Sequence, residues 1–394
     1  MKTFIWILLV FISFTSMGQD FYTKYDSIIE SQNKNNIEKL YKASERGNTY
    51  NFVWLSYVVD ANNTMYKATK NVKYLNYNLN IVNKLLKSGQ TDATNPDLKY
   101  SRRWIATIRK GASNDHMNQK EFLLFEGYLF RYLSEFAFLV KTNNIYTLQE
   151  QNEIIQFVSH NFLKVYRYSL DLYGDMSKLL QIRTHIGSHW AQMALFLNLL
   201  TTDKNEKALY QQVITLYNQG LRNNFKWHKN SNGKPYYTWN STWDKPFTNM
   251  QKERKKQGKD THTIQDVSHG NQVIEYIINS YELDYKEWGK NDLIYLKNTL
   301  TEKIWLTQTK FADNVDGTMS YITSVQGTGY KQSSGWMKLM LYDSTFTLYD
   351  RYKKYYNNNR NFVDKRFNNL QYYANFIYYK SYNELKVFEK YFVN

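Results

Sequence analysis

Proline is almost absent from this chain, so few positions force a helical pattern to stop. Only three prolines, Pro96, Pro235 and Pro246, occur among 394 residues. Proline lacks a backbone N–H and clashes with the preceding turn, and its absence leaves long segments free to form helices. Apolar residues recur three and four apart in these segments, which is the period of a helix with one buried face. The sequence therefore predicts an all-α protein.

The predicted helices follow one another through short polar connections. They cover residues 20–44, 72–86, 121–140, 148–172, 180–200, 204–221, 273–283, 290–306 and 334–355. This succession is typical of antiparallel helical hairpins. The sequence has no strict repeat, so a regular solenoid is not supported. We expect an α/α toroid, as an incomplete or six-hairpin barrel around a central cavity, with residues 19–394 in a single domain. A division near Gly111 stays open, although no Pro- or Ser-rich linker marks it.

Two long segments interrupt the helical pattern. Residues 223–263 contain a stretch rich in Trp and Tyr followed by a run of charged residues, and residues 311–334 are rich in Gly, Ser and Thr. Loops of this length in a compact domain are usually functional or disordered. The Trp and Tyr content of the first segment argues against disorder there.

The amino terminus has the pattern of a secretory signal peptide. Lys2 precedes an apolar run over residues 4–14, and small residues follow at Ser16 and Gly18. The run is too short for a membrane span of about 20 residues, and no later apolar stretch is long enough for one. We expect residues 1–18 to be removed and the protein to be exported to the periplasm, the cell surface or the medium. An uncleaved anchor is the alternative.

Cysteine is absent and the net charge is +16. Disulfides, thiolate metal sites and cysteine nucleophiles are thereby excluded. A strong positive charge favours anionic partners, but the lysines are scattered and no nucleic-acid-binding motif accompanies them. We expect no nucleic acid as partner, and an extracellular acidic polysaccharide fits an exported basic protein. Lysine and asparagine enrichment from an AT-rich genome is the alternative reason for the charge.

Histidines and tryptophans gather in one quarter of the chain. Residues 181–276 hold five of the seven histidines, namely His185, His189, His228, His262 and His269, together with Trp190, Trp227, Trp239 and Trp243. Imidazole titrates near neutral pH and is the commonest proton-transfer group. Indoles offer flat apolar faces to weakly polar ligands. The combination predicts a carbohydrate-binding cleft.

Two helix starts carry the candidate proton-transfer groups. His185 and His189 lie one turn apart beside an apolar stripe, so one helix presents both. This is also a zinc spacing, but the glutamate of HExxH is missing, and we expect neither a metal nor a cofactor. In the second segment, Asp266 or Ser268 can cap a helix whose first turn holds His269, with Asn271 nearby. Helix starts attract anions, although all of these residues also suit a purely structural role.

The first of these segments resembles a known family. Thr184-His185-Ile186-Gly187-Ser188-His189-Trp190 is similar to the segment that opens an inner helix in the α/α-toroid polysaccharide lyases, the alginate lyases among them, which share the six-hairpin glycosidase superfamily's architecture. In that family an Asn and a His act on the uronate carboxylate, and Tyr and His transfer protons. Thr184 stands where the family has its Asn.

The leading hypothesis is an exported polysaccharide lyase that cleaves an acidic polysaccharide by β-elimination. His185, His189, Arg183 and Asn240 are placed around the substrate carboxylate, with His269 or Tyr237 as base and a tyrosine as acid. The predicted catalytic residues are His189, His269, Tyr237 and His185, and the predicted substrate-binding residues are Arg183, Asn240, Trp239, Trp243, Asp266, Asn271 and Tyr330. We expect alanine at His189 or His269 to abolish turnover without changing stability.

Two other functions compete with this hypothesis. A six-hairpin glycoside hydrolase would use two carboxylates drawn from Asp266, Glu275, Asp316 and Glu126. A glycan-binding protein of the cell envelope would use the aromatic cleft without proton chemistry.

Overall fold

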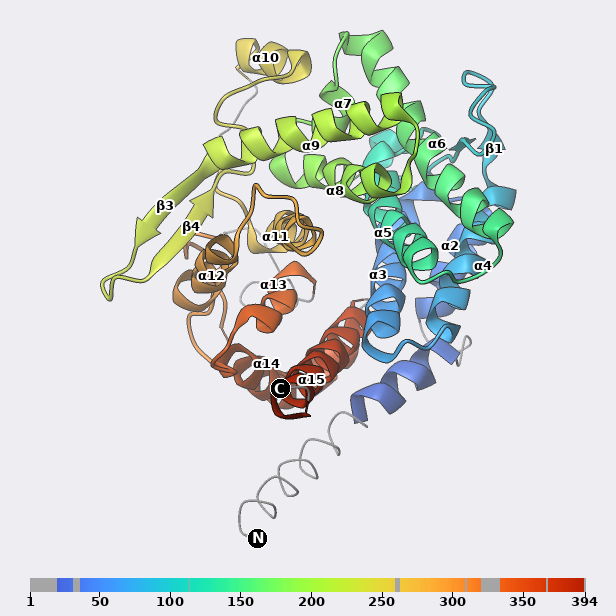
Figure 1. Cartoon of the computed structure of the whole chain (residues 1–394). Helices are drawn as coiled ribbons and strands as arrows, with labels where there is room; N and C mark the ends of the chain where they lie inside the picture. Colours follow the sequence, from blue (N-terminus) through green and yellow to red (C-terminus); the bar gives the residue numbers. More distant parts are fainter. Residues whose placement is uncertain are drawn as a thin grey trace.

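The computed structural model describes residues 20–30, 36–112, 114–258, 263–308, 310–319, 334–365 and 368–392. Helices make up 68% of the structure, and the described residues form only two small two-stranded sheets (Figure 1). The predicted all-α class is therefore confirmed. The predicted signal peptide lies outside the described residues.

Six helices contact one another in succession around the middle of the molecule. They are α3 (Phe52–Thr69), α5 (Leu123–Thr142), α8 (Thr184–Leu200), α11 (Val267–Glu282), α13 (Gly335–Lys338) and α15 (Asn369–Phe392). Each packs against the next one named, and α15 packs against α3 again (Figure 1). We call these the inner helices.

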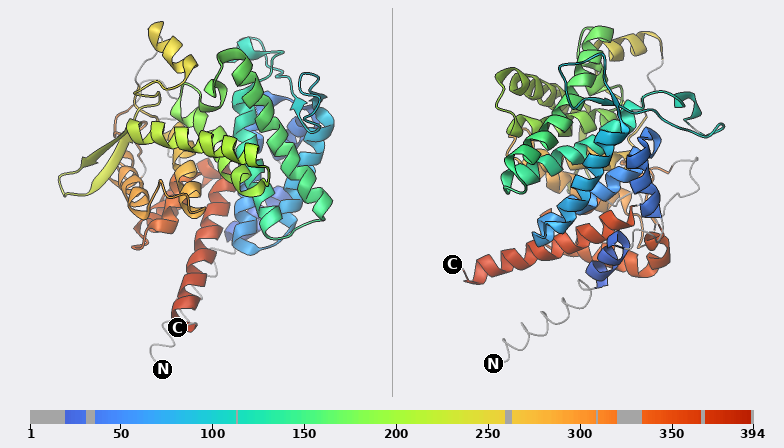
Figure 2. Two further views of the ribbon diagram at one scale, coloured as in Figure 1. Left: turned by 45° about the horizontal axis from the view of Figure 1, so that its top comes forward. Right: turned by 90° about the vertical axis from the view of Figure 1, so that its right-hand side faces the viewer.

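Four further helices follow an inner helix in the sequence and pack against it or beside it. They are α4 (Lys73–Ser88), α6 (Leu148–Tyr173), α9 (Lys204–Asn224) and α12 (Lys290–Thr299). In Figure 1 these four lie farther from the middle of the molecule than their inner partners. The remaining helices are α2 (Asn36–Arg46), α7 (Ser177–Leu180), α10 (Asn249–Lys256) and α14 (Thr347–Asp364), and residues 20–30 are also helical. Figure 2 shows the end of α15 extending beyond the other helices.

Short elements connect the helices. They are the 3-10 helices η1 (Thr49–Asn51), η2 (Asp115–Met117) and η5 (Leu339–Tyr342), the π-helix η3 (Leu300–Ile304), and the paired strands β1 (Gln90–Thr91) and β2 (Arg102–Arg103). The predicted helix 334–355 is therefore three pieces, and the predicted helix 180–200 begins only at Thr184, as α8, after the short helix α7. Gln181 has a φ of 52°, and this left-handed residue ends α7 before α8 begins.

The segment 223–263, predicted to be irregular, contains a β-hairpin and a helix. Strand β3 (Phe225–Lys229) pairs antiparallel with β4 (Pro235–Trp239), and the hairpin projects from the helices (Figure 1). Asn232-Gly233 lies in the turn, where Gly233 has a φ of +74°. An Asn-Gly pair between two strands is a strong hairpin signal, and it could have revealed this element.

The space between the inner helices contains charged side chains that are almost fully buried. Lys338 donates to Asp60 at 2.9 Å and also to Glu275. Glu275 accepts a further bond of 2.6 Å from Tyr132, and Arg131 lies 3.4 Å from the same carboxylate. Burial raises the pKa of Asp60 to about 6, although Lys338 opposes the shift. Charges removed from water need such partners, so this network ties four inner helices to one arrangement.

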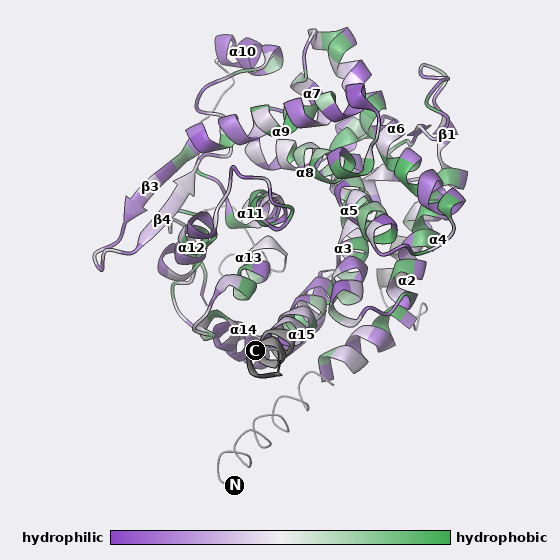
Figure 3. Cartoon of the chain, in the orientation of Figure 1, coloured by the Kyte–Doolittle hydropathy of each residue, from purple (hydrophilic) through white to green (hydrophobic). Residues whose placement is uncertain are grey.

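Hydrophobic residues form most of the contacts between the helices. In Figure 3 they are frequent on α5 and α8, whereas α10 and β3 at the periphery are mostly hydrophilic. Within the described part of the chain, no helix combines the length and the apolar composition that crossing a membrane requires.

Candidate functional site

The start of α8 is held in place by backbone and side-chain contacts around Thr184. Its N–H donates to the Ser241 carbonyl at 2.9 Å, and its hydroxyl donates to Gln265 at 3.0 Å. Gly187 lies one turn further on, where an added Cβ would be 2.6 Å from the Leu180 carbonyl. Thr184 therefore anchors the helix that carries His185 and His189, and Gly187 allows α7 to pack closely against it.

Asp266 caps α11 and binds the imidazole of His269. One carboxylate oxygen accepts the His269 backbone N–H at 3.0 Å, and the other lies 2.8 Å from His269 Nδ1. Burial opposes ionisation, but the bonds from His269 hold the pKa of Asp266 well below its usual range. A carboxylate on Nδ1 fixes the proton there and leaves the lone pair on Nε2. Since 47% of the His269 side chain is exposed, a ligand can reach part of the imidazole.

His185 stacks on His269. The two ring centroids are 4.2 Å apart, and the rings are inclined by 23°. His185 is buried, and this burial, together with the charge of a protonated His269, lowers its pKa well below the usual value. His185 is therefore neutral at pH 7. The structure thus brings one predicted histidine of α8 and one of α11 together.

His189 lies deeper, against Tyr128 of α5. The two ring centroids are 4.0 Å apart, and His189 is fully buried. Burial, and next the charge of Arg131, lowers the pKa of His189 well below its usual value. Neither ring nitrogen has a hydrogen-bond partner among the described residues. Such a side chain is an exception, because nearly all buried polar groups are hydrogen-bonded.

Arg131 is a member of this cluster that the sequence analysis missed. Its guanidinium lies over the Tyr128 ring, 5.6 Å from the centroid, and its Nε and Nη1 have no hydrogen-bond partner in the described part of the chain. An arginine in the otherwise apolar stretch 127–133 was the available signal, because a buried guanidinium needs acceptors. Tyr128 and Tyr57 also belong here: burial, and next the neighbouring Tyr57, raises the pKa of Tyr128, and Arg131 opposes the shift.

Arg183 is exposed at the same end of α8. Its Nη1 lies 3.3 Å from the Ser241 hydroxyl, and its charge contributes to the lowered pKa of His185. Asn271 is buried and accepts the Trp336 backbone N–H at 3.2 Å, so this side chain fixes α13 against α11.

Four predicted residues have placements that do not support the predicted roles. Tyr237 is buried, and its hydroxyl donates to Asp292 at 2.8 Å, at the interface of β4 and α12. Asn240 donates to Asp244 at 2.7 Å. The indoles of Trp239 and Trp243 are buried, the latter donating to the Gln181 carbonyl at 2.9 Å, so neither offers a face to a substrate. These aromatic rings are part of the hydrophobic core, where the hairpin and the segment after it pack against the helices.

Two residues that the sequence analysis singled out have no described position. Tyr330 and His262 lie outside the described residues. His228 is on β3, where its Nε2 lies 2.9 Å from the Thr238 hydroxyl. It belongs to the hairpin and has no contact with the other histidines.

The carboxylates proposed for a glycosidase do not form an open pair. Glu275 binds Lys338 and Tyr132, and Glu126 binds Lys164 at 3.1 Å, both fully inside the protein. Asp316 closes a turn by accepting the Thr318 hydroxyl at 2.7 Å. In the part of the chain that the structure describes, no group of three or more His, Asp or Glu residues has the arrangement of a metal site.

The candidate site is thus a two-layered cluster at the starts of α8 and α11. The accessible layer holds His269, Asp266, Arg183 and the half-buried Tyr57, and the buried layer holds His185, His189, Tyr128 and Arg131. Comparison with known proteins adds no further constraint, because neither a family model, a curated protein nor a solved structure matches the chain.

Proposed function

We propose that this chain is an exported lyase that cleaves an acidic polysaccharide by β-elimination, and that its inner helices belong to an incomplete α/α toroid. The observation that carries the proposal is the pairing of Asp266 with His269 beside the exposed Arg183. The unbroken succession of contacts around the inner helices supports the toroid.

The base in this proposal is Nε2 of His269. It removes the proton from C5 of a uronate unit, the released electron pair forms the C4–C5 double bond, and the bond from C4 to the glycosidic oxygen breaks. Asp266 stabilises the imidazolium that forms, since it already binds Nδ1 at 2.8 Å. The neutral His185 beneath the ring adds no opposing charge.

Arg183 neutralises the uronate carboxylate in this proposal. A guanidinium binds a carboxylate through two parallel hydrogen bonds, and a neutralised carboxylate makes the neighbouring C5 proton more acidic. Arg183 replaces the expected Asn240 in this role, because the side chain of Asn240 is held by Asp244. Tyr57, a half-buried tyrosine of α3, is assigned as the acid that protonates the leaving oxygen.

The test is to incubate the purified protein with alginate, polygalacturonate, chondroitin sulfate and hyaluronan, with dextran as a neutral control. A lyase releases an unsaturated sugar that absorbs ultraviolet light, and it leaves dextran intact. Reducing ends without this absorbance would identify a hydrolase instead. Binding without any product would identify a glycan-binding protein, and either result would overturn the proposal.

A further inference from the structure

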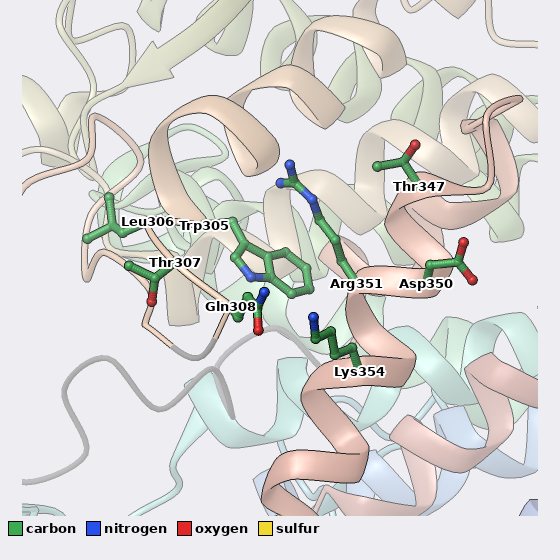
Figure 4. A pocket seen from close by; sticks show the side chains of 8 residues that line it. All are labelled: Trp305, Leu306, Thr307, Gln308, Thr347, Asp350, Arg351 and Lys354. Atoms are coloured by element: carbon green, nitrogen blue, oxygen red, sulfur yellow. The ribbon is translucent and has the colours of Figure 1, made fainter.

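A pocket of about 500 Å³ lies between the segment that follows η3 and the first two turns of α14. It is lined by Trp305, Leu306, Thr307, Gln308, Thr347, Asp350, Arg351 and Lys354 (Figure 4). None of these residues belongs to the candidate site described above. The volume is suitable for one or two sugar units.

The floor of this pocket is rigid and aromatic. The indole of Trp305 packs between the rings of Phe311 and Tyr352, with centroid distances of 4.7 and 4.8 Å. Only 7% of Trp305 is exposed, so its orientation is fixed by packing before any ligand arrives. The small exposed part of this fixed indole gives the pocket an apolar patch that a C–H group of a sugar ring can contact.

Two cations surround the indole. Figure 4 shows Arg351, Lys354 and Gln308 around Trp305, with the Asp350 carboxylate pointing away from the ring. The guanidinium carbon of Arg351 is 5.9 Å from the indole centroid, and its one hydrogen bond, to the Thr301 carbonyl, is long at 3.5 Å. Among the described residues, neither Arg351 nor Lys354 forms an ion pair. Their charges are therefore available to an anionic ligand.

We infer that this pocket binds a carboxylated or sulfated sugar unit and serves as a second binding site for an acidic polysaccharide. The inference rests on the proposed function only for the choice of ligand. An apolar patch of indole with an arginine and a lysine beside it suits a ring that is apolar on one side and anionic at its edge. A neutral sugar would leave both cations without a partner.

The experiment compares two double variants in native gels that contain polygalacturonate, chondroitin sulfate or dextran. Arg351→Ala with Lys354→Ala removes the pocket cations. Lys255→Ala with Lys256→Ala removes the same charge from exposed positions on α10, far from α14 in Figure 1. We expect the pocket variant to bind the acidic polymers at least about tenfold more weakly, which corresponds to losing one charge-assisted hydrogen bond. The α10 variant should stay within about twofold of the wild-type protein, and dextran should retard none of them.

Equal loss of affinity in both variants would show a general charge effect and would overturn the inference, as would full affinity in the pocket variant. Ultraviolet-absorbing product is measured in parallel. If binding depends on the pocket but no product forms, the lyase proposal is refuted and the second binding site is supported. If product forms but binding does not depend on the pocket, the lyase proposal is supported and the second binding site is refuted. Absence of both binding and product refutes both.

Discussion

His269 and His189 differ in exposure, and the difference decides what each one contributes. The side chain of His269 is half exposed, so His269→Ala removes the proposed base without opening a cavity in the core. We expect turnover of the acidic polysaccharide to fall by about 100- to 10,000-fold while the thermal midpoint stays nearly unchanged. Ultraviolet product assays and thermal unfolding test this directly, and retained turnover would exclude His269 as the base.

His189 is expected to behave differently because it is fully buried against Tyr128. His189→Ala opens a cavity in the core, at a cost of roughly 2–4 kcal/mol of the unfolding free energy. This replaces the expectation from the sequence that stability would be unaffected. Denaturant unfolding measures the loss, and a stability equal to that of the wild-type protein would contradict the packing described above.

Asp266 combines a helix cap with the orientation of His269, and two substitutions separate these roles. Asp266→Asn keeps an oxygen for the His269 backbone N–H but presents an amide N–H to Nδ1, which moves the ring proton to Nε2. We expect turnover to fall by more than about 100-fold with little loss of stability. Asp266→Ala should cost about 1 kcal/mol more, because the cap is lost as well.

Asp203 supplies the matched control for this pair. It caps α9 by accepting the backbone N–H groups of Asn205 and Glu206, at 2.8 and 2.9 Å, away from the histidines. Asp203→Asn should leave both turnover and stability near the wild-type values. Equal turnover in Asp266→Asn and Asp203→Asn would show that the cap at Asp266 is its only role.

At the scale of elements, the close contact between α11 and α13 depends on Gly335. A Cβ added there would lie 2.2 Å from the Asn271 carbonyl oxygen and 3.0 Å from the Glu275 backbone nitrogen, and neither atom can move alone. Gly335→Ala should therefore lower the unfolding free energy by at least about 2 kcal/mol. Gly289→Ala is the control, since its nearest atom would be 3.9 Å away. Equal unfolding midpoints for the two variants would contradict the contact.

The inner helices α3 and α15 were missing from the sequence prediction, and their buried polar residues explain why. In α3, Asp60, Asn62, Asn63 and Thr64 are all buried, and in α15 the same holds for Gln371 and Asn375. Helix prediction from periodicity assumes that polar residues face water. Where the interior itself is polar, the apolar stripe is interrupted and the pattern disappears.

At the scale of the whole molecule, buried acids and buried histidines give opposite pH dependences of stability. Burial raises the pKa of Glu126 to about 7, against roughly 4.3 in an unfolded chain. The folded protein therefore holds this proton more tightly, and the stabilisation is lost as the pH rises from about 4.5 to 7. We expect the unfolding free energy of the wild-type protein to fall relative to Glu126→Gln over this window, as measured by urea unfolding.

His185→Gln is the comparison of opposite sign. The lowered pKa of His185 means that the unfolded chain takes up the proton first, so its contribution is present above about pH 6.5 and is lost as the pH falls. Wild-type stability should therefore fall relative to His185→Gln on acidification. Parallel curves for the wild-type protein and both variants would contradict the burial of these groups.

The sequence by itself determined the helical class, the helices α4, α6, α9 and α12 that lie outside the inner helices, the cap before His269, and the placement of His185 and His189 one turn apart on one helix. Each of these follows from local rules: proline-free apolar periods, a cap before a helix start, and residues one turn apart on one face. Only the tertiary structure decided that His185 stacks on His269, and which other side chains surround these histidines. Arg131 and Tyr128 come from another helix, while Trp239 and Trp243 turn into the core, because burial and pairing depend on elements distant in the sequence.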